Sequence, residues 1–250
     1  MSGQKLDKDV KKAILGARSL VAECFKADGN EAETRARVRH IFGSLLGYDV
    51  FKHVTSEYAI SSAGETVHCD LAVQLGSEEA SKPEILIELK RVNMDLSPKH
   101  LRQASSYAID IGCDWILLTN SREWKFYHVT YGQPPQTKLI ESWDLLNDDL
   151  ETINRKFEMI SYKNVKKQGL VVLWKKRDVL NANNMLKTIL SEEFLKLYQR
   201  RLKQVTGITV SPEDIVGQFR QLLNEAASSE MAKINISLPA KKQSTKDIKD

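Results

Sequence analysis

Two short, mostly apolar runs lie in the first half of the chain, at 68–75 and 83–91. Both runs are rich in Val, Ile and Leu, and the turn between them contains Gly and Pro, which is typical of two strands joined by a turn. Asp70, Glu88 and Lys90 are charged where such strands should be apolar. Because side chains alternate across a strand, Glu88 and Lys90 face the same way. The pattern therefore predicts two carboxylates and an ammonium that converge on one place in a largely buried sheet.

Two helices are predicted before these two strands. Apolar residues recur at helical intervals over 5–26 and again over about 30–46. Asn30 is suited to begin the second helix, with Glu33 as its capping-box partner. Residues 48–60 follow, with the pattern of one strand or two short ones.

The segments after the centre predict a mixed sheet. A helix is expected over 98–111, where Ser precedes Pro at the first helical position. Strands are expected at 114–119, 123–130 and 137–143. A strand–helix–strand order from residue 85 onward implies a crossover connection between parallel neighbours.

The sequence pattern changes near residue 147: the alternation of apolar and polar residues ends, and apolar residues then recur at helical spacing among many charged residues. We place a boundary there, between an α/β domain at 1–147 and a helical region at 148–250. The polar composition from 228 onward predicts a mobile tail. The helices of this region are expected at 148–160, about 163–181, 183–206 and 212–227.

Composition narrows the class of protein. The chain has 250 residues, a net charge of +4 and three scattered cysteines, which argues against a disulfide scaffold and against a zinc site. No apolar run approaches the ~20 residues that a membrane helix needs, and the first residues lack the apolar core of a signal peptide. We therefore expect a cytoplasmic protein without membrane contact.

The charged centre suggests metal chemistry. Two carboxylates on neighbouring strands, Asp70 and Glu88, with the carbonyl oxygen of Leu89, are the hard ligands that Mg²⁺ prefers. Lys90 would orient a water or stabilise developing negative charge. Gln103 and Tyr107 lie four residues apart on the next predicted helix and would offer neutral hydrogen-bonding groups. The alternative from the residues alone is a structural ion pair of Lys90 with Glu88 or Asp70.

These residues, in this order, resemble those of the PD-(D/E)xK nuclease superfamily. Within it, the chain is most similar to the nuclease domain at the N-terminus of type I restriction enzyme R subunits. The resemblance covers about residues 30–130. The matching residues are Asp70, Glu88-Leu-Lys90 and Gln103-Ala-Ser-Ser-Tyr107, together with the stretches 30–35, 46–49 and 115–120.

The resemblance implies a restriction-endonuclease-like αβββαβ core with a mixed sheet flanked by helices. It also implies hydrolysis of DNA phosphodiesters with Mg²⁺ or Mn²⁺, and a helix-borne Glu near the metal. Glu31 is the first candidate for that Glu and Glu33 the second, against the alternative that both only complement the helix dipole. No Gly-x-x-x-x-Gly-Lys-Ser/Thr motif occurs, so we expect a stand-alone nuclease domain without ATP or a motor.

Several alternatives stay open. The chain could be a catalytically silent relative that binds nucleic acid or a protein partner, and a homo-oligomer or partner subunit fits equally. Glu57 is expected at an exposed strand edge, against the alternative of a role in the site. His68 lies two residues before Asp70 and could face the site, but we expect it to point away. Basic clusters that would contact a phosphate backbone, rather than form a solvated helix face, are Lys166, Lys167, Lys175, Lys176 and Arg177.

Overall fold

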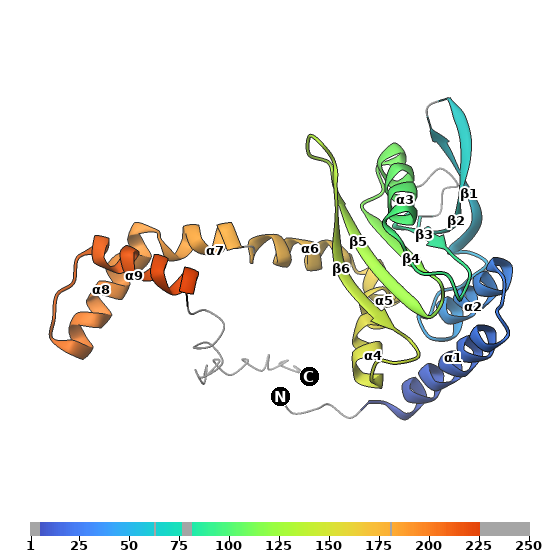
Figure 1. Ribbon diagram of the computed structural model, residues 1–250, viewed down its shortest axis with the longest axis horizontal. Coiled ribbons are helices and arrows are strands. Elements are labelled where there is room, and N and C mark those ends of the chain that lie inside the picture. Colours follow the sequence, from blue (N-terminus) through green and yellow to red (C-terminus); the bar gives the residue numbers. More distant parts are fainter. Residues whose placement is uncertain (1–5, 63, 77–81, 181, 226–250) are drawn as a thin grey trace, which may run out of the picture. The chain divides into compact units, whose positions relative to one another are not determined.

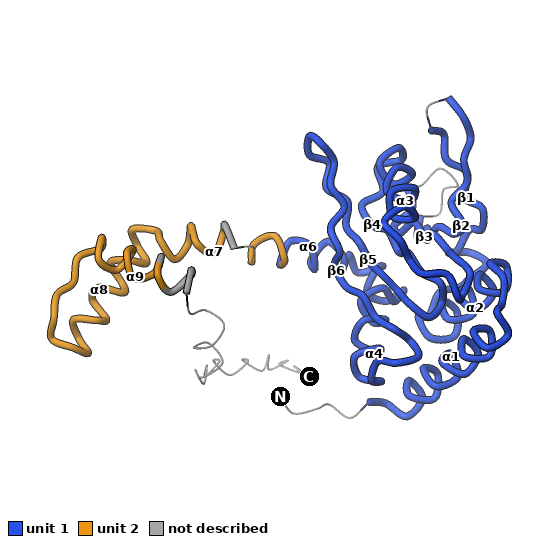
Figure 2. The backbone as a smooth tube through the Cα atoms, viewed as in Figure 1, with its two compact units in different colours: residues 1–176 blue, residues 177–250 orange. Residues whose placement is uncertain are grey.

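The structure is a computed structural model of the chain, and it describes residues 6–62, 64–76, 82–180 and 182–225. The backbone forms two compact units, residues 1–176 and residues 177–250 (Figure 2). The first unit holds the sheet and the helices that cover it. The described part of the second unit is helical. The predicted mobile tail falls outside the described residues.

Six strands form one mixed sheet, and their spatial order follows their order in the chain (Figure 1). All neighbours are antiparallel except β3 and β4, which are parallel, with α3 between them in the chain. The predicted parallel neighbours and their helical connection are thus confirmed. The strands are β1 (Val54–Ser62), β2 (Glu65–Val73), β3 (Ile85–Leu89), β4 (Trp115–Thr119), β5 (Glu123–Thr130) and β6 (Gln136–Asp144).

The two central strands are buried along their whole length. Every residue of β3 and of β4 is buried, which is usual for parallel strands covered on both faces. Their apolar side chains alternate between two separate cores. Ile87 and Leu117 point to one core, and Leu86 and Ile116 point to the other. A charged residue in this part of the sheet therefore lies in an otherwise apolar layer.

Helices cover both faces of the sheet. One core is closed by α1, α2 and α4, and the other by α3, whose Ala104 and Ala108 face the strands. The capping box predicted at Asn30 and Glu33 is present and fixes the start of α2. The helix predicted at 98–111 is present at those bounds. The helices of the first unit are α1 (Lys8–Lys26), α2 (Glu31–Ser44), α3 (Pro98–Ile111), α4 (Leu150–Met159) and α5 (Tyr162–Lys166).

The first unit continues beyond the boundary that the sequence pattern suggested at residue 147. Phe157 of α4 packs edge-on against Trp124 and Trp143, with ring centroids 5.1 and 5.4 Å apart. The hydroxyl of Tyr48 donates a hydrogen bond of 2.8 Å to the carbonyl of Ile160. The end of α4 is therefore part of the same core as the sheet, although its sequence is helical in texture.

Two of the long helices expected in the C-terminal region are each interrupted. Gln168 adopts a positive φ of 59° between α5 and α6. Ser191 caps α8 and so separates it from α7. The remaining helices are α6 (Gly169–Val179), which crosses the boundary between the units, and α7 (Ala182–Ile189), α8 (Glu192–Thr206) and α9 (Pro212–Glu225) of the second unit.

The fold class expected from the sequence, a mixed sheet flanked by helices and followed by a helical region, is therefore observed. None of the described helices is both long enough and apolar enough to cross a membrane.

Candidate active site

Asp70 lies where the β2–β3 ladder ends. The two strands pair through Leu71 and Ile87, and the ladder does not continue to the next facing residues, Asp70 and Glu88. Instead of a backbone carbonyl of β2, the side chain of Asp70 binds β3 here: its Oδ2 accepts a hydrogen bond of 2.7 Å from the backbone N–H of Leu89. The two predicted carboxylates thus stand beside each other where the sheet opens.

Glu88 and Lys90 form a buried ion pair on the other side of this opening. Lys90 Nζ donates to Glu88 Oε1 at 2.7 Å, and the side chains are only 14% and 3% exposed. Burial raises the pKa of Glu88, the contact with Lys90 works against that rise, and the negative charges of Asp70 and Glu31 add to it. Burial alone would lower the pKa of Lys90, but Glu88 and its neighbouring carboxylates raise it. Lys90 is therefore an ammonium in this state.

Arg35 of α2 holds Asp70 from the opposite side. One guanidinium nitrogen donates to Asp70 Oδ1 at 2.9 Å and another to Glu57 Oε1 at 3.2 Å. Glu57 has a left-handed φ of 51° in the middle of β1, which is uncommon for this residue type. No sequence pattern predicted this bridge, because any helical arginine is compatible with a solvated surface.

The carboxylate of Asp70 lies beside an open pocket of about 260 Å³. Arg35, Glu57 and His68 also line it. Glu57 is exposed, as expected for a strand edge, yet it faces the site through Arg35. His68, which was expected to lie away from the site, lines the same pocket. Asp70 and Arg35 are therefore reachable from solvent through this pocket, whereas Glu88 does not line it and its side chain is 3% exposed.

The structure separates the two glutamates of the α2 first turn. Glu33 accepts the hydrogen bond of Asn30 N at 2.9 Å and so serves the capping box. Glu31 is half-buried, and its charge acts on Glu88 and Lys90. Glu31 thus lies near the carboxylates, as its place as first candidate requires.

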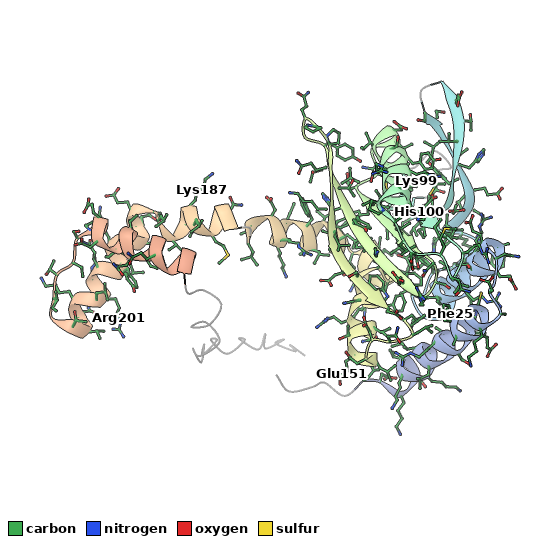
Figure 3. All side chains as sticks on the ribbon, in the orientation of Figure 1. Phe25, Lys99, His100, Glu151, Lys187 and Arg201 are labelled. Carbon is green, nitrogen blue, oxygen red and sulfur yellow. The ribbon has the colours of Figure 1, made fainter. Side chains whose placement is uncertain are left out.

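The residues of α3 have a different arrangement from the one expected. Gln103 Nε2 and the Tyr107 hydroxyl lie 3.2 Å apart and hydrogen-bond to each other, and no described hydrogen bond joins either to the charged cluster. His100 lies in the first turn of the same helix (Figure 3), and the charges of Lys90 and Glu31 act on it. Burial lowers its pKa, as does the charge of Lys90, while Glu31 opposes them. His100 is a site neighbour that the sequence reasoning missed, since five histidines are scattered along the chain.

The donor set can be compared with the needs of Mg²⁺. Among the described residues, no three His, Cys, Asp or Glu side chains come together as a metal-holding group. The adjacent carboxylates of Asp70 and Glu88, together with a backbone carbonyl at Leu89, still provide only hard oxygen atoms, which suit Mg²⁺. Arg35 would have to release Asp70 Oδ1 before that oxygen could bind a metal ion.

The five predicted phosphate-contacting residues are dispersed. Lys167 and Lys176 line a cavity between α4, α5 and α6. Lys166 instead donates to the hydroxyl of Tyr162 at 3.1 Å and lies over its ring. Lys175 is exposed in α6, outside that cavity, and Arg177 is the first residue of the second unit.

A comparison with known families complements this geometry. Residues 30–142 match the family model described as type I restriction enzyme R protein N terminus, a stretch that contains every residue of the candidate site. Neither the curated proteins nor the solved structures give a match. Residues 30–142 are therefore similar to the N-terminal region of type I restriction enzyme R proteins, which is the relationship that the sequence resemblance indicated.

Proposed function

We propose that this chain is a metal-dependent endonuclease of the PD-(D/E)xK type that hydrolyses phosphodiester bonds in DNA. The observation that carries the proposal is the meeting of Asp70 and Glu88 where β2 and β3 separate, with the Lys90 ammonium on Glu88. The element order α2, β1, β2, β3, α3, β4 is the αβββαβ order that such a core requires. The family match supports a restriction-related domain in the same stretch.

Asp70 and Glu88 would hold the metal, with the Leu89 carbonyl as a further ligand. Glu31, whose charge acts on Glu88 and Lys90, would accept a hydrogen bond from a coordinated water. When bound, Mg²⁺ neutralises phosphate charge and lowers the pKa of a bound water.

Lys90 contributes in two ways. Its ammonium has three donors, and within the part of the chain that the structure describes only Glu88 accepts from it, so the other donors would stabilise negative charge that develops on the phosphate. Its contact also favours the ionised form of Glu88, against the effect of burial. Lys90 thus limits the rise in pKa that burial causes in a carboxylate that we propose binds the metal.

Arg35 is the group that changes partner in this proposal. Its guanidinium neutralises Asp70 in the absence of metal. A cation that displaces it leaves Arg35 beside the pocket, still paired with Glu57, where a DNA phosphate is a natural new partner for a guanidinium.

A second function is favoured by one specific observation. Both site carboxylates are already neutralised, Asp70 by Arg35 and Glu88 by Lys90, so the fold is electrostatically satisfied without a metal. A catalytically silent module that binds nucleic acid or a protein partner would have this property.

A cleavage assay separates the two functions. Supercoiled plasmid is incubated with the full chain in Mg²⁺ or Mn²⁺ without ATP, and the wild type is compared with Asp70→Ala and Lys90→Ala. Asp110→Ala and Lys12→Ala, at exposed positions outside the site, are the matched controls. We expect both site variants to lose at least ~100-fold in rate, and the controls to cleave like the wild type. Equal cleavage by all five proteins would exclude the proposed site, and DNA binding without cleavage by the wild type would favour the silent module.

A further inference from the structure

A second concave surface lies outside the stretch that matches the family. It is formed by the end of α4, by α5 and by the start of α6, all within the first unit, and has a volume of about 470 Å³. We call it the α4–α6 groove. Its charged lining consists of four basic side chains and one acidic side chain, Arg155, Lys163, Lys167, Lys176 and Glu158.

The basic groups of the groove are not engaged elsewhere. Among the described residues, none of the four makes an ion pair within 4.0 Å. All four are exposed, although they stand around a hollow and not on a convex face. Like charges gathered around a hollow repel one another, so this arrangement favours an anion that lies between them.

The backbone beneath these side chains is fixed. Lys163 lies in α5, and Lys167, four residues later, caps the C-terminal end of that helix, so the two side chains lie on the same side. Asn164 Nδ2 donates to the carbonyl of Met159 at 2.7 Å, which fastens α5 to the end of α4. Gly169 leaves room for that side chain, because a Cβ at this position would collide with Asn164. The ammonium groups thus project from a rigid base.

A series of contacts within the first unit runs from the helix that carries Arg35 to the start of α5. Arg39 follows Arg35 by one turn of α2 and donates to the carbonyls of Val50 and Val54 at 3.1 Å each. His53, in the turn that Arg39 holds, stacks on Tyr162 at 4.8 Å. Tyr162 begins α5, next to Lys163. The candidate active site and the groove therefore belong to the same compact unit and are linked by packed segments.

The charge pattern identifies the class of ligand. Several separate cations spread over a groove suit a chain of repeating negative charges better than a single small anion, and the phosphate backbone of DNA carries one charge per ~1.7 Å of axis. We propose that the α4–α6 groove binds the DNA phosphate backbone and anchors the substrate apart from the hydrolytic residues. The choice of DNA as the polyanion rests on the proposed function.

The groove also refines the set of phosphate-contacting residues. Lys167 and Lys176 belong to it, as the sequence pattern suggested, and Arg155 and Lys163 join them. Lys166 does not line it, because its ammonium is directed to Tyr162.

Binding without metal tests this inference separately from cleavage. Anisotropy of a labelled 30-base-pair duplex is measured with the full chain in EDTA at several salt concentrations. The test variant is Lys163→Gln, Lys167→Gln, Lys176→Gln. The matched control is Lys8→Gln, Lys11→Gln, Lys12→Gln on exposed positions of α1, which removes the same net charge.

We expect the groove variant to raise the Kd at least ~10-fold, and the slope of log K against log salt to become shallower by about 2 to 3. The control should change the Kd less than ~2-fold, since its lysines lie outside the groove. Equal weakening in both variants, or no weakening in the groove variant, overturns the inference.

Two further results distinguish this inference from the proposed function. If the wild type cleaves DNA and the groove variant binds like the wild type, the groove assignment fails while the nuclease assignment stands. If the wild type binds through the groove but neither Mg²⁺ nor Mn²⁺ gives cleavage, the nuclease assignment fails and the groove stands.

Discussion

The buried pair of Glu88 and Lys90 makes a quantitative prediction about stability in the absence of metal. Substitution of Lys90→Met keeps most of the apolar stem but removes the ammonium from a carboxylate that is only 3% exposed. Removal of one partner of a buried ion pair usually costs ~3–5 kcal/mol, because the other charge is left uncompensated. Since the Lys90 side chain is 14% exposed, we expect the lower end, about 3 kcal/mol at pH 8.

The loss should depend on pH in a defined direction. In the variant, Glu88 keeps the pKa rise that burial causes and loses the opposing effect of Lys90. Its pKa in the folded state is then above that in the unfolded state, so the folded state binds the proton more tightly and stability falls as pH rises. The variant should therefore be less destabilised at pH 5 than at pH 8.

A double-mutant cycle measures the effect. Urea unfolding in EDTA is followed by tryptophan fluorescence, since all four tryptophans lie between residues 115 and 174, in the first unit. The cycle combines Lys90→Met with Glu88→Gln, and a control cycle uses the exposed pair of Lys82 and Asp114, 3.5 Å apart. We expect a coupling energy of about 2 kcal/mol for the buried pair and less than ~1 kcal/mol for the exposed pair. A buried-pair coupling no larger than that of the control, or one that is greater at pH 5, would refute the reasoning.

Three further predictions use the same preparation. Tyr48→Phe leaves the buried carbonyl of Ile160 without its 2.8 Å partner and should lower the free energy of unfolding by about 1–2 kcal/mol in urea. His128 is buried, stacks on Trp174 at 3.8 Å and has a lowered pKa because of burial, so the wild type should lose thermal stability as pH falls from 7 through the ordinary value of 6.5. His128→Phe should lose less, and parallel melting profiles of the two proteins would disprove this assignment. Mg²⁺ at ten times its Kd should stabilise the wild type by about 1.4 kcal/mol and leave Asp70→Asn unchanged in calorimetry, whereas equal stabilisation of both would place the ion elsewhere.

The centre of the fold could be predicted from the sequence because its signals are local. The apolar runs around Asp70 and Glu88, the Gly- and Pro-containing turn and the Pro98 helix start each determine structure within a few residues. A charge in an apolar layer is costly unless it is paired or bound to metal, so the positions of these charges in the sequence already pointed to a site. The family match covers the same stretch.

The partners of these charges could not be predicted, because they depend on tertiary contacts. Arg35 is separated from Asp70 by 35 positions, and no periodic pattern marks it among the other arginines of α2. His100 comes close to Lys90 only because α3 folds back over the sheet. The four-residue spacing predicts that Gln103 and Tyr107 share one face of the helix. It does not predict that their side chains hydrogen-bond to each other.

The extent of the first unit shows another limit of pattern reading. A change from alternating to helical spacing marks a change of secondary structure, whereas the limits of a compact unit depend on what the helices pack against. Phe157 and Ile160 are buried in the same core as Trp143, so α4 belongs to the same unit as the sheet, although its sequence has helical spacing. The α4–α6 groove exists because of that packing, and only its lysines were visible in the sequence.

The position of a bound cation tests the central assignment most directly. Crystals of the full chain grown with Mn²⁺ can be measured at the manganese absorption edge, where anomalous scattering locates the ion. The account predicts one Mn²⁺ about 2 Å from carboxylate oxygens of Asp70 and Glu88, with Arg35 released from Asp70. An ion bound elsewhere, or none at this place under conditions in which the same protein cleaves DNA, would contradict it.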